Sequence, residues 1–541
     1  MGQKFRSGHG PDEAMLMPAD PREWLPAGHL AWKVLDLAGE MDLPGFGAPY
    51  RPDGQGGRPY HPRVMATLLL YCYCRGRRSS RDIEMATFDD VGARVICGGL
   101  HPDHSTVAEF VRRNAGAVLG LLPASVKACA AEGLVDLSVV AGDGTKLKAN
   151  AAMAGNLTRQ QLDAQVAELE AWIDAELREW VQDMPGGEGA PGAAPASRDG
   201  GPGGGGPGGG GKRKWEKKPP RAARMLEARL AARARLDAAQ DKDQGKHEAR
   251  IAELAARVAR KEGAARKHEA AAAARLAARA RKEAAGQRVA GARPVASAGE
   301  DRDVRRTRQA LAKARAAHQA ACRQAASSAA DPKARVNPAD PSSMVMPLKK
   351  GGYGQLFNVQ ALATAKTQVI LAVTRHPSPV DVRALEGLLA EARSVLRRAG
   401  VPGRIRRALF DAGYASEANF TADLPETLYV AVAREARQTG RSAAGCDQQT
   451  ALPGWQEMTA RLNTPEGKAL YKQRAATIEP VFAQLTARLG RALHYRGPLA
   501  DAELALWAAS HNILKAITAR TKQPARQPRI ATTAAAAPAA A

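Results

Sequence analysis

The segment VDLSVVAGDGTKLKANA, at residues 135–151, decides the predicted fold. Its apolar residues are typical of a buried strand, and they are Val135, Leu137, Val139 and Val140. Asp143 stands where this apolar run ends, and Gly144 and Thr145 follow it. The segment therefore predicts a buried strand that ends in a carboxylate.

Further strands and helices are predicted downstream. Strands are expected within 356–376 (two, around 364–366), 406–416 and 428–435, and helices within 380–400, 466–490 and 503–518. The order is strand, long insertion, strand, strand, helix, strand, strand, helix. This order indicates an α/β domain formed by residues 131–155 and 336–520, which the insertion splits after its first strand.

The insertion, residues 156–335, carries most of the charge of the chain. The 541 residues have a formal net charge of +24, and Lys212 to Arg323 contain 31 Lys or Arg against 13 Asp or Glu, a net +18. This stretch is rich in Ala, which favours long solvated helices, and a Gly-rich linker (200–211) precedes it. A pI near 10.0 indicates a polyanionic partner, most simply nucleic acid. The insertion either contacts DNA or mediates contacts between copies.

The N-terminal flank, residues 20–130, predicts an all-α domain of the helix-turn-helix kind. A strongly apolar helix is expected from Arg63 to Cys74, and Thr106 with Glu109 has capping-box spacing. Four basic residues, Arg75, Arg77, Arg78 and Arg81, cluster between this helix and the next predicted one. They contact DNA phosphates or form a solvated turn. Residues 1–19 are expected to be flexible and 521–541 disordered.

Several classes of protein are disfavoured. There is no run of about 18 apolar residues and no apolar segment near the start, so neither a membrane span nor a secretory signal is expected. Six Cys in 541 residues do not form a disulfide framework. We therefore expect a reduced protein in the cytoplasm with no membrane partner.

Three acids stand out as candidates for chemistry. Asp143 and Asp411 each follow an apolar strand, and Glu479 lies on a late helix among apolar residues. Taken singly, each has an ordinary interpretation, as a turn residue or a solvated carboxylate. If the three converge, their charges repel unless cations neutralise them. Carboxylate oxygens suit Mg²⁺ or Mn²⁺, and two such ions about 3.5–4 Å apart act on phosphodiesters.

Several motifs together resemble a known family. They are DPREWLP (20–26), HPRVMATLLLYCYCRGRRSSRDIE (61–84), PDHSTVAEFVRR (102–113), GDGTKLKANA (142–151), NPADPSSMVMPLKKGGYGQLFNVQ (337–360), LFDAGYASEANF (409–420), YKQRAATIEPVFAQL (471–485) and ASHNILK (509–515). In this order they resemble the DDE transposases of bacterial insertion sequences, in the subgroup named for insertion sequence eleven-eighty-two.

The resemblance implies a ribonuclease H-like catalytic fold that uses two divalent ions, Mg²⁺ or Mn²⁺. It implies that Asp143, Asp411 and Glu479 are the catalytic residues and metal ligands. Tyr471 and Arg474 would then grip a phosphate near the scissile bond. The family often has a Lys seven residues after the Glu, whereas this chain has Thr486 there.

The expected function is therefore DNA cleavage at the ends of a mobile element, followed by strand transfer. The expected partners are double-stranded DNA, as terminal inverted repeats and target DNA, and a second copy of the chain in a homodimer. The protein would associate with the nucleoid when bound to DNA. Two alternatives stay open, a transposase-derived metal-dependent nuclease that cuts without joining and an inactive DNA-binding relative.

Overall fold

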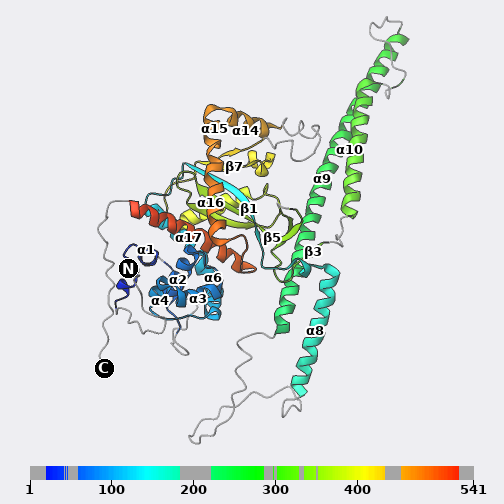
Figure 1. Ribbon diagram of the computed structural model, residues 1–541. Helices are drawn as coiled ribbons and strands as arrows, with labels where there is room; N and C mark the ends of the chain where they lie inside the picture. The colour runs from blue at the N-terminus through cyan, green and yellow to red at the C-terminus, as the bar shows by residue number, and fades with distance from the viewer. Residues whose placement is uncertain are drawn as a thin grey trace, which may run out of the picture. The chain divides into compact units, whose positions relative to one another are not determined.

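The computed structural model describes residues 20–41, 43, 45–46, 59–182, 221–285, 297, 301–327, 334–348, 351–432 and 452–522. The predictions for residues 1–19, for the Gly-rich linker and for most of the tail fall outside these residues. The chain divides into two compact units (Figure 1), one formed by Met1–Met153 with Ser342–Ala541 and the other by Ala154–Pro341.

A six-stranded mixed sheet forms the centre of the first unit. Its strands are β1 (Val139–Lys148), β4 (Met344–Pro347), β5 (Tyr353–Thr364), β6 (Ile370–His376), β7 (Arg407–Phe410) and β8 (Thr427–Val430). The order is β4-β5-β1-β7-β8, and β6 pairs with β5 on the edge that β5 shares with β4. β1, β5 and β6 are antiparallel neighbours, whereas β7 and β8 run parallel to β1. The predicted α/β character is confirmed.

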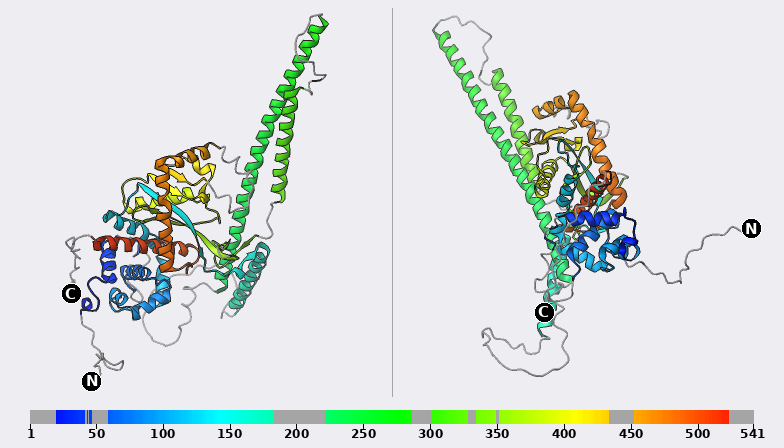
Figure 2. Two further views of the ribbon diagram at one scale, coloured as in Figure 1. Left: turned by 45° about the horizontal axis from the view of Figure 1, so that its top comes forward. Right: turned by 90° about the vertical axis from the view of Figure 1, so that its left-hand side faces the viewer.

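The strands coincide with apolar runs in the sequence. Helices cover both faces of the sheet, so residues on both sides of a strand are buried. β5 is buried from Leu356 to Thr364, and helix α11 (Leu385–Ala399) contacts β5 and β6. α16 (Gln473–Leu489) contacts β1 and β5, and α17 (Pro498–Lys522) contacts β6. Figure 2 shows α16 running across the sheet.

Short elements complete the C-terminal part of this unit. They are η4 (Ala412–Tyr414), α12 (Glu417–Phe420), α14 (Pro453–Asn463) and α15 (Pro465–Tyr471). The predicted helix 466–490 is therefore two helices, α15 and α16, with a break at Lys472.

The N-terminal flank is helical, as expected. Its elements are η1 (Pro21–Glu23), α1 (Leu30–Glu40), α2 (Pro62–Cys74), α3 (Ser80–Asp89), α4 (Val91–Cys97), α5 (His104–Arg113), α6 (Ala115–Leu119) and α7 (Leu121–Ala131). The predicted capping box at Thr106 is wrong. Asp103 is the N-cap of α5 and accepts from the Thr106 backbone N–H at 2.9 Å, because its carboxylate lies one turn closer to the helix start.

One hydrophobic core joins the N-terminal helices to the sheet. α17 packs against α2, α6 and α7 as well as β6. Asn512 makes this joint specific, because its side chain pairs with both the N–H and the C=O of Ile370 and donates to Ser125 Oγ at 3.1 Å. The helical flank is thus packed onto the sheet domain rather than tethered to it.

The second unit consists of long helices. Its elements are η2 (Met153–Gly155), β2 (Leu157–Thr158), α8 (Arg159–Gln182), α9 (Arg221–Ala284), α10 (Arg302–Ser327) and β3 (Arg335–Val336). α9 packs against α8 near its start and against α10 over its second half. A small apolar cluster of Leu162, Ala232 and Val336 joins α8, α9 and β3.

Within the described residues, no single helix has the length and apolar content needed to cross a membrane, although one sharply bent pair, His104–Arg113 with Ala115–Ala131, passes on length and composition alone.

Candidate active site

Asp143 and Asp411 lie side by side on neighbouring parallel strands. In the register of β1 and β7, Ala141 lies opposite Leu409. Asp143 comes two residues after Ala141, and Asp411 comes two residues after Leu409. Adjacent strands lie about 4.8 Å apart, so extending the register brings the two carboxylates together. Asp411 follows β7 directly, at the end of the strand as predicted. Asp143 instead lies within β1, which continues to Lys148 because β5 pairs with it there.

The electrostatics of Asp143 reflect this neighbour. Burial and then the charge of Asp411 raise the pKa of Asp143 from 3.8 to about 6, although the Gly144 N–H and Arg474 act in the opposite direction. The Gly144 N–H donates to Asp143 Oδ1 at 2.7 Å, and the Gly413 N–H donates to Asp411 Oδ1 at 2.9 Å. The pKa of Asp143 therefore stays raised although a backbone N–H and a guanidinium face its carboxylate.

Arg474 connects this pair to Glu479. Its Nη1 lies 3.2 Å from Asp143 Oδ2, and its Nη2 lies 3.7 Å from Glu479 Oε1. Arg474 and Glu479 both lie in the first two turns of α16, and Tyr471 ends the preceding helix α15. Burial raises the pKa of Tyr471. Arg474 therefore contacts both Asp143 and Glu479, and Tyr471 lies close enough to feel the charges of Arg474 and Asp411.

Glu479 lies at the rim of this arrangement. Its side chain is 62% exposed, whereas that of Asp143 is 23% exposed. Among the residues that the structure describes, no three His, Cys, Asp or Glu side chains are grouped closely enough to hold a metal ion. The guanidinium of Arg474 lies between Asp143 and Glu479, so a third carboxylate ligand would come from a rearrangement of these two α16 side chains.

The donors present nonetheless suit a hard divalent cation. Asp143 and Asp411 offer carboxylate oxygens, and the raised pKa of Asp143 means that an additional positive charge would be favourable there. Glu479 is exposed and so has space to turn toward them.

Asp381, just before α11, is a fourth acid at this site that the sequence analysis missed. Its Oδ1 accepts from Asn358 Nδ2 at 2.9 Å and from Gln360 Nε2 at 2.7 Å. A Cβ on Gly144 would lie 2.9 Å from Asp381 Oδ1, and one on Gly413 would lie 3.4 Å from Oδ2. Each of these glycines lies one or two residues after a site aspartate, which was the available signal for a close approach.

The four arginines from the end of α2 to the first turn of α3, Arg75, Arg77, Arg78 and Arg81, separate into two groups. Arg78 is only 13% exposed, donates to the Ala492 carbonyl at 2.6 Å, lies 3.6 Å from Glu503 and stacks over Trp507. In this structure the guanidinium of Arg78 therefore serves as the counterion of Glu503, a fully buried acid, and the predicted contact of Arg78 with DNA stays a prediction.

The other three arginines remain near solvent. Arg75 is 51% exposed and lies 3.5 Å from Asp90, and Arg77 pairs with Asp89 at 2.8 Å. Arg81 is exposed and lines a polar depression.

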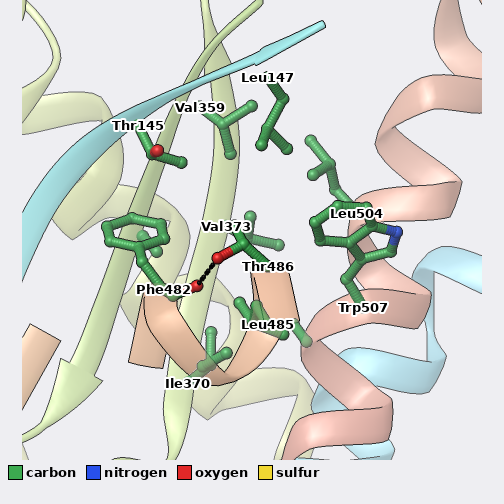
Figure 3. A pocket seen from close by; sticks show the side chains of 12 residues that line it. Thr145, Leu147, Val359, Ile370, Val373, Phe482, Leu485, Thr486, Leu504 and Trp507 are labelled. Carbon is green, nitrogen blue, oxygen red and sulfur yellow. Dashed lines mark hydrogen bonds between the residues drawn. The ribbon is translucent and has the colours of Figure 1, made fainter. Parts of the chain in front are cut away.

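A small cavity separates α16 from β1 and shows how the helix is seated (Figure 3). Its volume is about 20 Å³, enough for one water at most, and its wall is apolar. Thr145 and Leu147 of β1 face Phe482, Leu485 and Thr486 of α16 across it.

Thr145 lies two residues after Asp143, so α16 packs on the face of β1 that carries that aspartate. Thr486 stands where the family often has Lys; it lines this cavity, and its hydroxyl donates to the Phe482 carbonyl at 2.8 Å.

Two family models match the chain. A model described as a transposase domain (DUF772) matches residues 20–113, and a model described as a transposase DDE domain matches residues 447–517. The second match includes Tyr471, Arg474 and Glu479. Neither match covers half of the chain. No curated protein and no solved structure matches it.

The two matches support an insertion-sequence DDE transposase and, with it, a role in DNA transposition. The DDE domain suggests a nuclease or transposase activity, and such proteins act on DNA and generally use divalent metal ions.

Proposed function

We propose that this protein is a DDE transposase of the insertion sequence eleven-eighty-two subgroup, which cleaves DNA at the ends of its element and joins the freed 3′ ends to target DNA. Residues 131–155 and 336–520 form its ribonuclease H-like catalytic domain. The sheet supports this assignment, because three antiparallel strands are followed by two strands parallel to β1.

The observation that carries the proposal is the pairing of Asp143 with Asp411 beneath α16. The two aspartates come from strands far apart in sequence, and α16 adds Arg474 and Glu479 at the same place. A purely structural role is a poor explanation, because two adjacent, partly buried carboxylates repel each other and reduce stability.

Asp143, Asp411 and Glu479 would hold two divalent ions, Mg²⁺ or Mn²⁺. Such ions, when bound, lower the pKa of an attacking water or hydroxyl and stabilise the leaving oxygen of a phosphodiester. Arg474 would then leave Asp143 and bind a phosphate near the scissile bond, because guanidinium pairs with phosphate through two N–H groups. Tyr471, three residues before Arg474, would contact the same phosphate.

The helical flank, residues 20–130, would bind the terminal inverted repeats through basic side chains near solvent, such as Arg75, Arg77 and Arg81. A homodimer on DNA follows from the chemistry, because two element ends need two active sites or one site used twice. The protein would act in the cytoplasm, bound to the nucleoid.

The test is an end-cleavage and joining assay with duplexes that carry the inverted repeats flanking the gene. In Mg²⁺ the parent should release 3′-OH ends and join them to a target plasmid. Asp143→Asn should lose both reactions while still binding the duplex. Asp136→Asn is the matched control, because it removes a carboxylate seven residues earlier and should retain both reactions. Normal cleavage by Asp143→Asn would refute the site.

The same assay separates the alternatives. Cleavage of ends without joining would identify a transposase-derived nuclease. DNA binding without cleavage by the parent chain would identify an inactive relative.

A further inference from the structure

The distal half of α9 and the whole of α10 form an antiparallel helical pair, which we call the arginine hairpin (251–284 with 301–327). Three ion pairs set its register, Arg275 with Asp301 at 2.8 Å, Arg308 with Glu269 at 2.6 Å and Arg315 with Glu262 at 2.6 Å. The residue numbers of each pair add to nearly the same value, as a straight antiparallel pairing requires. The hairpin is thus a specific structure rather than two unrelated helices.

Apolar side chains of the hairpin are buried between its two helices. Leu254, Ala265 and Ala272 of α9 and Val304 and Ala314 of α10 are buried. They recur at spacings typical of one helix face, so they form one narrow seam. No described residue of the hairpin is an exposed large hydrophobic, whereas Trp172, Met225 and Leu230 are exposed where α8 packs on α9. Among the described side chains of the hairpin, a second copy of the chain would find no large exposed apolar side chain to bury.

Most acidic side chains of the hairpin form ion pairs with its own basic side chains. The hairpin contains 16 Lys or Arg and 6 Asp or Glu, a net charge of +10. Five of the six acids are in ion pairs within α9 and α10. Ten basic side chains are exposed and lie in no ion pair within the described part of the chain, namely Arg257, Arg260, Lys261, Lys267, Arg281, Lys282, Arg302, Arg305, Arg306 and Lys313.

The distribution of this charge indicates the class of partner. At about 1.5 Å per residue the 34 residues of α9 in the hairpin extend about 50 Å, and basic side chains occur along this length and on several sides. A membrane surface would require an exposed apolar face beside the basic one, which the described residues of the hairpin lack. A DNA duplex of the same length carries a phosphate charge about every 1.7 Å along its axis.

We propose that the arginine hairpin is a sequence-independent binding surface for the phosphate backbone of double-stranded DNA. The proposal rests on the proposed function for the identity of the polyanion, and it assigns the insertion to DNA contact rather than to contacts between copies. Contacts of this kind, between basic side chains and phosphates, carry no sequence information, so we expect the hairpin to bind duplexes of any sequence.

The test uses the full-length chain and a 30-base-pair duplex of arbitrary sequence, in EDTA so that no cleavage occurs. A neutral variant carries Arg257→Gln, Arg260→Gln, Lys261→Gln, Arg281→Gln and Lys282→Gln. A matched control keeps the charge at the same positions with Arg257→Lys, Arg260→Lys, Lys261→Arg, Arg281→Lys and Lys282→Arg. All of these residues favour helix, so circular dichroism should be unchanged in both variants.

The readout is the slope of log affinity against log salt concentration, from fluorescence anisotropy over a series of NaCl concentrations. Each lost phosphate contact lowers the slope by about 0.9, and a duplex meets part of the hairpin at a time, so the neutral variant should lose about 2 to 4 in slope. The control should keep the parent slope. An unchanged slope in the neutral variant would overturn the proposal. If the slope is unchanged and sedimentation also shows a lower mass for the neutral variant than for the parent, the hairpin would instead be assigned to contacts between copies.

The proposed function is tested separately by end cleavage in Mg²⁺. If the parent chain cleaves ends and the neutral variant keeps the salt slope of the parent, only the proposal that the hairpin binds DNA is refuted. A parent that does not cleave while its neutral variant loses slope refutes the transposase proposal alone.

Discussion

Replacing Asp143 by Asn should stabilise the metal-free protein at pH 8. Burial and the charge of Asp411 raise the pKa of Asp143 from 3.8 to about 6, so its ionisation opposes folding. A pKa difference of one between the folded and unfolded chain corresponds to about 1.4 kcal/mol, which sets a ceiling of about 3 kcal/mol on the gain. The substitution also removes the ion pair with Arg474 at 3.2 Å. We therefore expect a net gain of about 1–2 kcal/mol in the free energy of unfolding, below this ceiling.

The sign of the pH dependence follows from proton binding. Between about pH 4 and pH 6 the native state holds a proton on Asp143 that the unfolded chain has lost, so the free energy of unfolding of the parent falls as pH rises. The amide of the Asp143→Asn variant does not titrate in this range. The advantage of the variant should therefore be small at pH 4, grow through pH 6 and stay constant above about pH 7.

Asp136→Asn provides a control of opposite sign. Hydrogen bonds from Ser138, and then Lys366 at 2.9 Å, lower the pKa of Asp136 to about 2. Its ionised form stabilises the fold above about pH 4, and this contribution is lost as pH falls toward about 2. Asp136→Asn should therefore cost up to about 2 kcal/mol at pH 8.

The assay is urea denaturation followed by tryptophan fluorescence at pH 4, 6 and 8 in EDTA. Saturating Mn²⁺ should then raise the midpoint of the parent and leave that of Asp143→Asn unchanged, because a ligand stabilises only the state that binds it. An Asp143→Asn variant that is less stable than the parent at pH 8, or equally stabilised at pH 4 and pH 8, would refute the reasoning.

Further substitutions test the surroundings of the site. Arg78→Ala should lower the free energy of unfolding by about 2–4 kcal/mol at pH 8 in denaturant melts, because it leaves the buried Glu503 without its cation. Arg81→Ala should change stability by less than about 0.5 kcal/mol and weaken binding of the inverted repeat in anisotropy titrations, since its side chain is exposed. Gly144→Ala should lose end cleavage and about 1–3 kcal/mol of stability, because the new Cβ would lie 2.9 Å from Asp381 Oδ1; a variant with parental activity would show that this close approach is unimportant.

The strands and helices of the sheet domain were predictable because their apolar patterns are local. β1 formed within the predicted segment 135–151, although it begins at Val139 and not at Val135, and α11 is capped at its C-terminus by Gly400, whose φ of 65° suits glycine. The sequence predicts the helix cap at Thr106, whereas in the structure it is Asp103. Both residue types are good caps, and only the backbone geometry distinguishes them.

The contacts between distant segments were not predictable from local pattern. Nothing in the sequence around Asp381 says that its carboxylate meets the backbone after Asp143 and Asp411. In the same way, Arg78 reads as one more basic turn residue, although a fully buried glutamate far along the chain, Glu503, takes it into the interior. Both facts depend on tertiary packing.

The most direct test of the account is to locate Mn²⁺ by anomalous scattering in crystals of the protein with an inverted-repeat duplex. The account predicts two peaks, about 3.5–4 Å apart, held by Asp143, Asp411 and Glu479, with Arg474 turned away from Asp143 toward a phosphate. Crystals with ordered DNA and no manganese at these carboxylates, or with manganese held elsewhere, would contradict it.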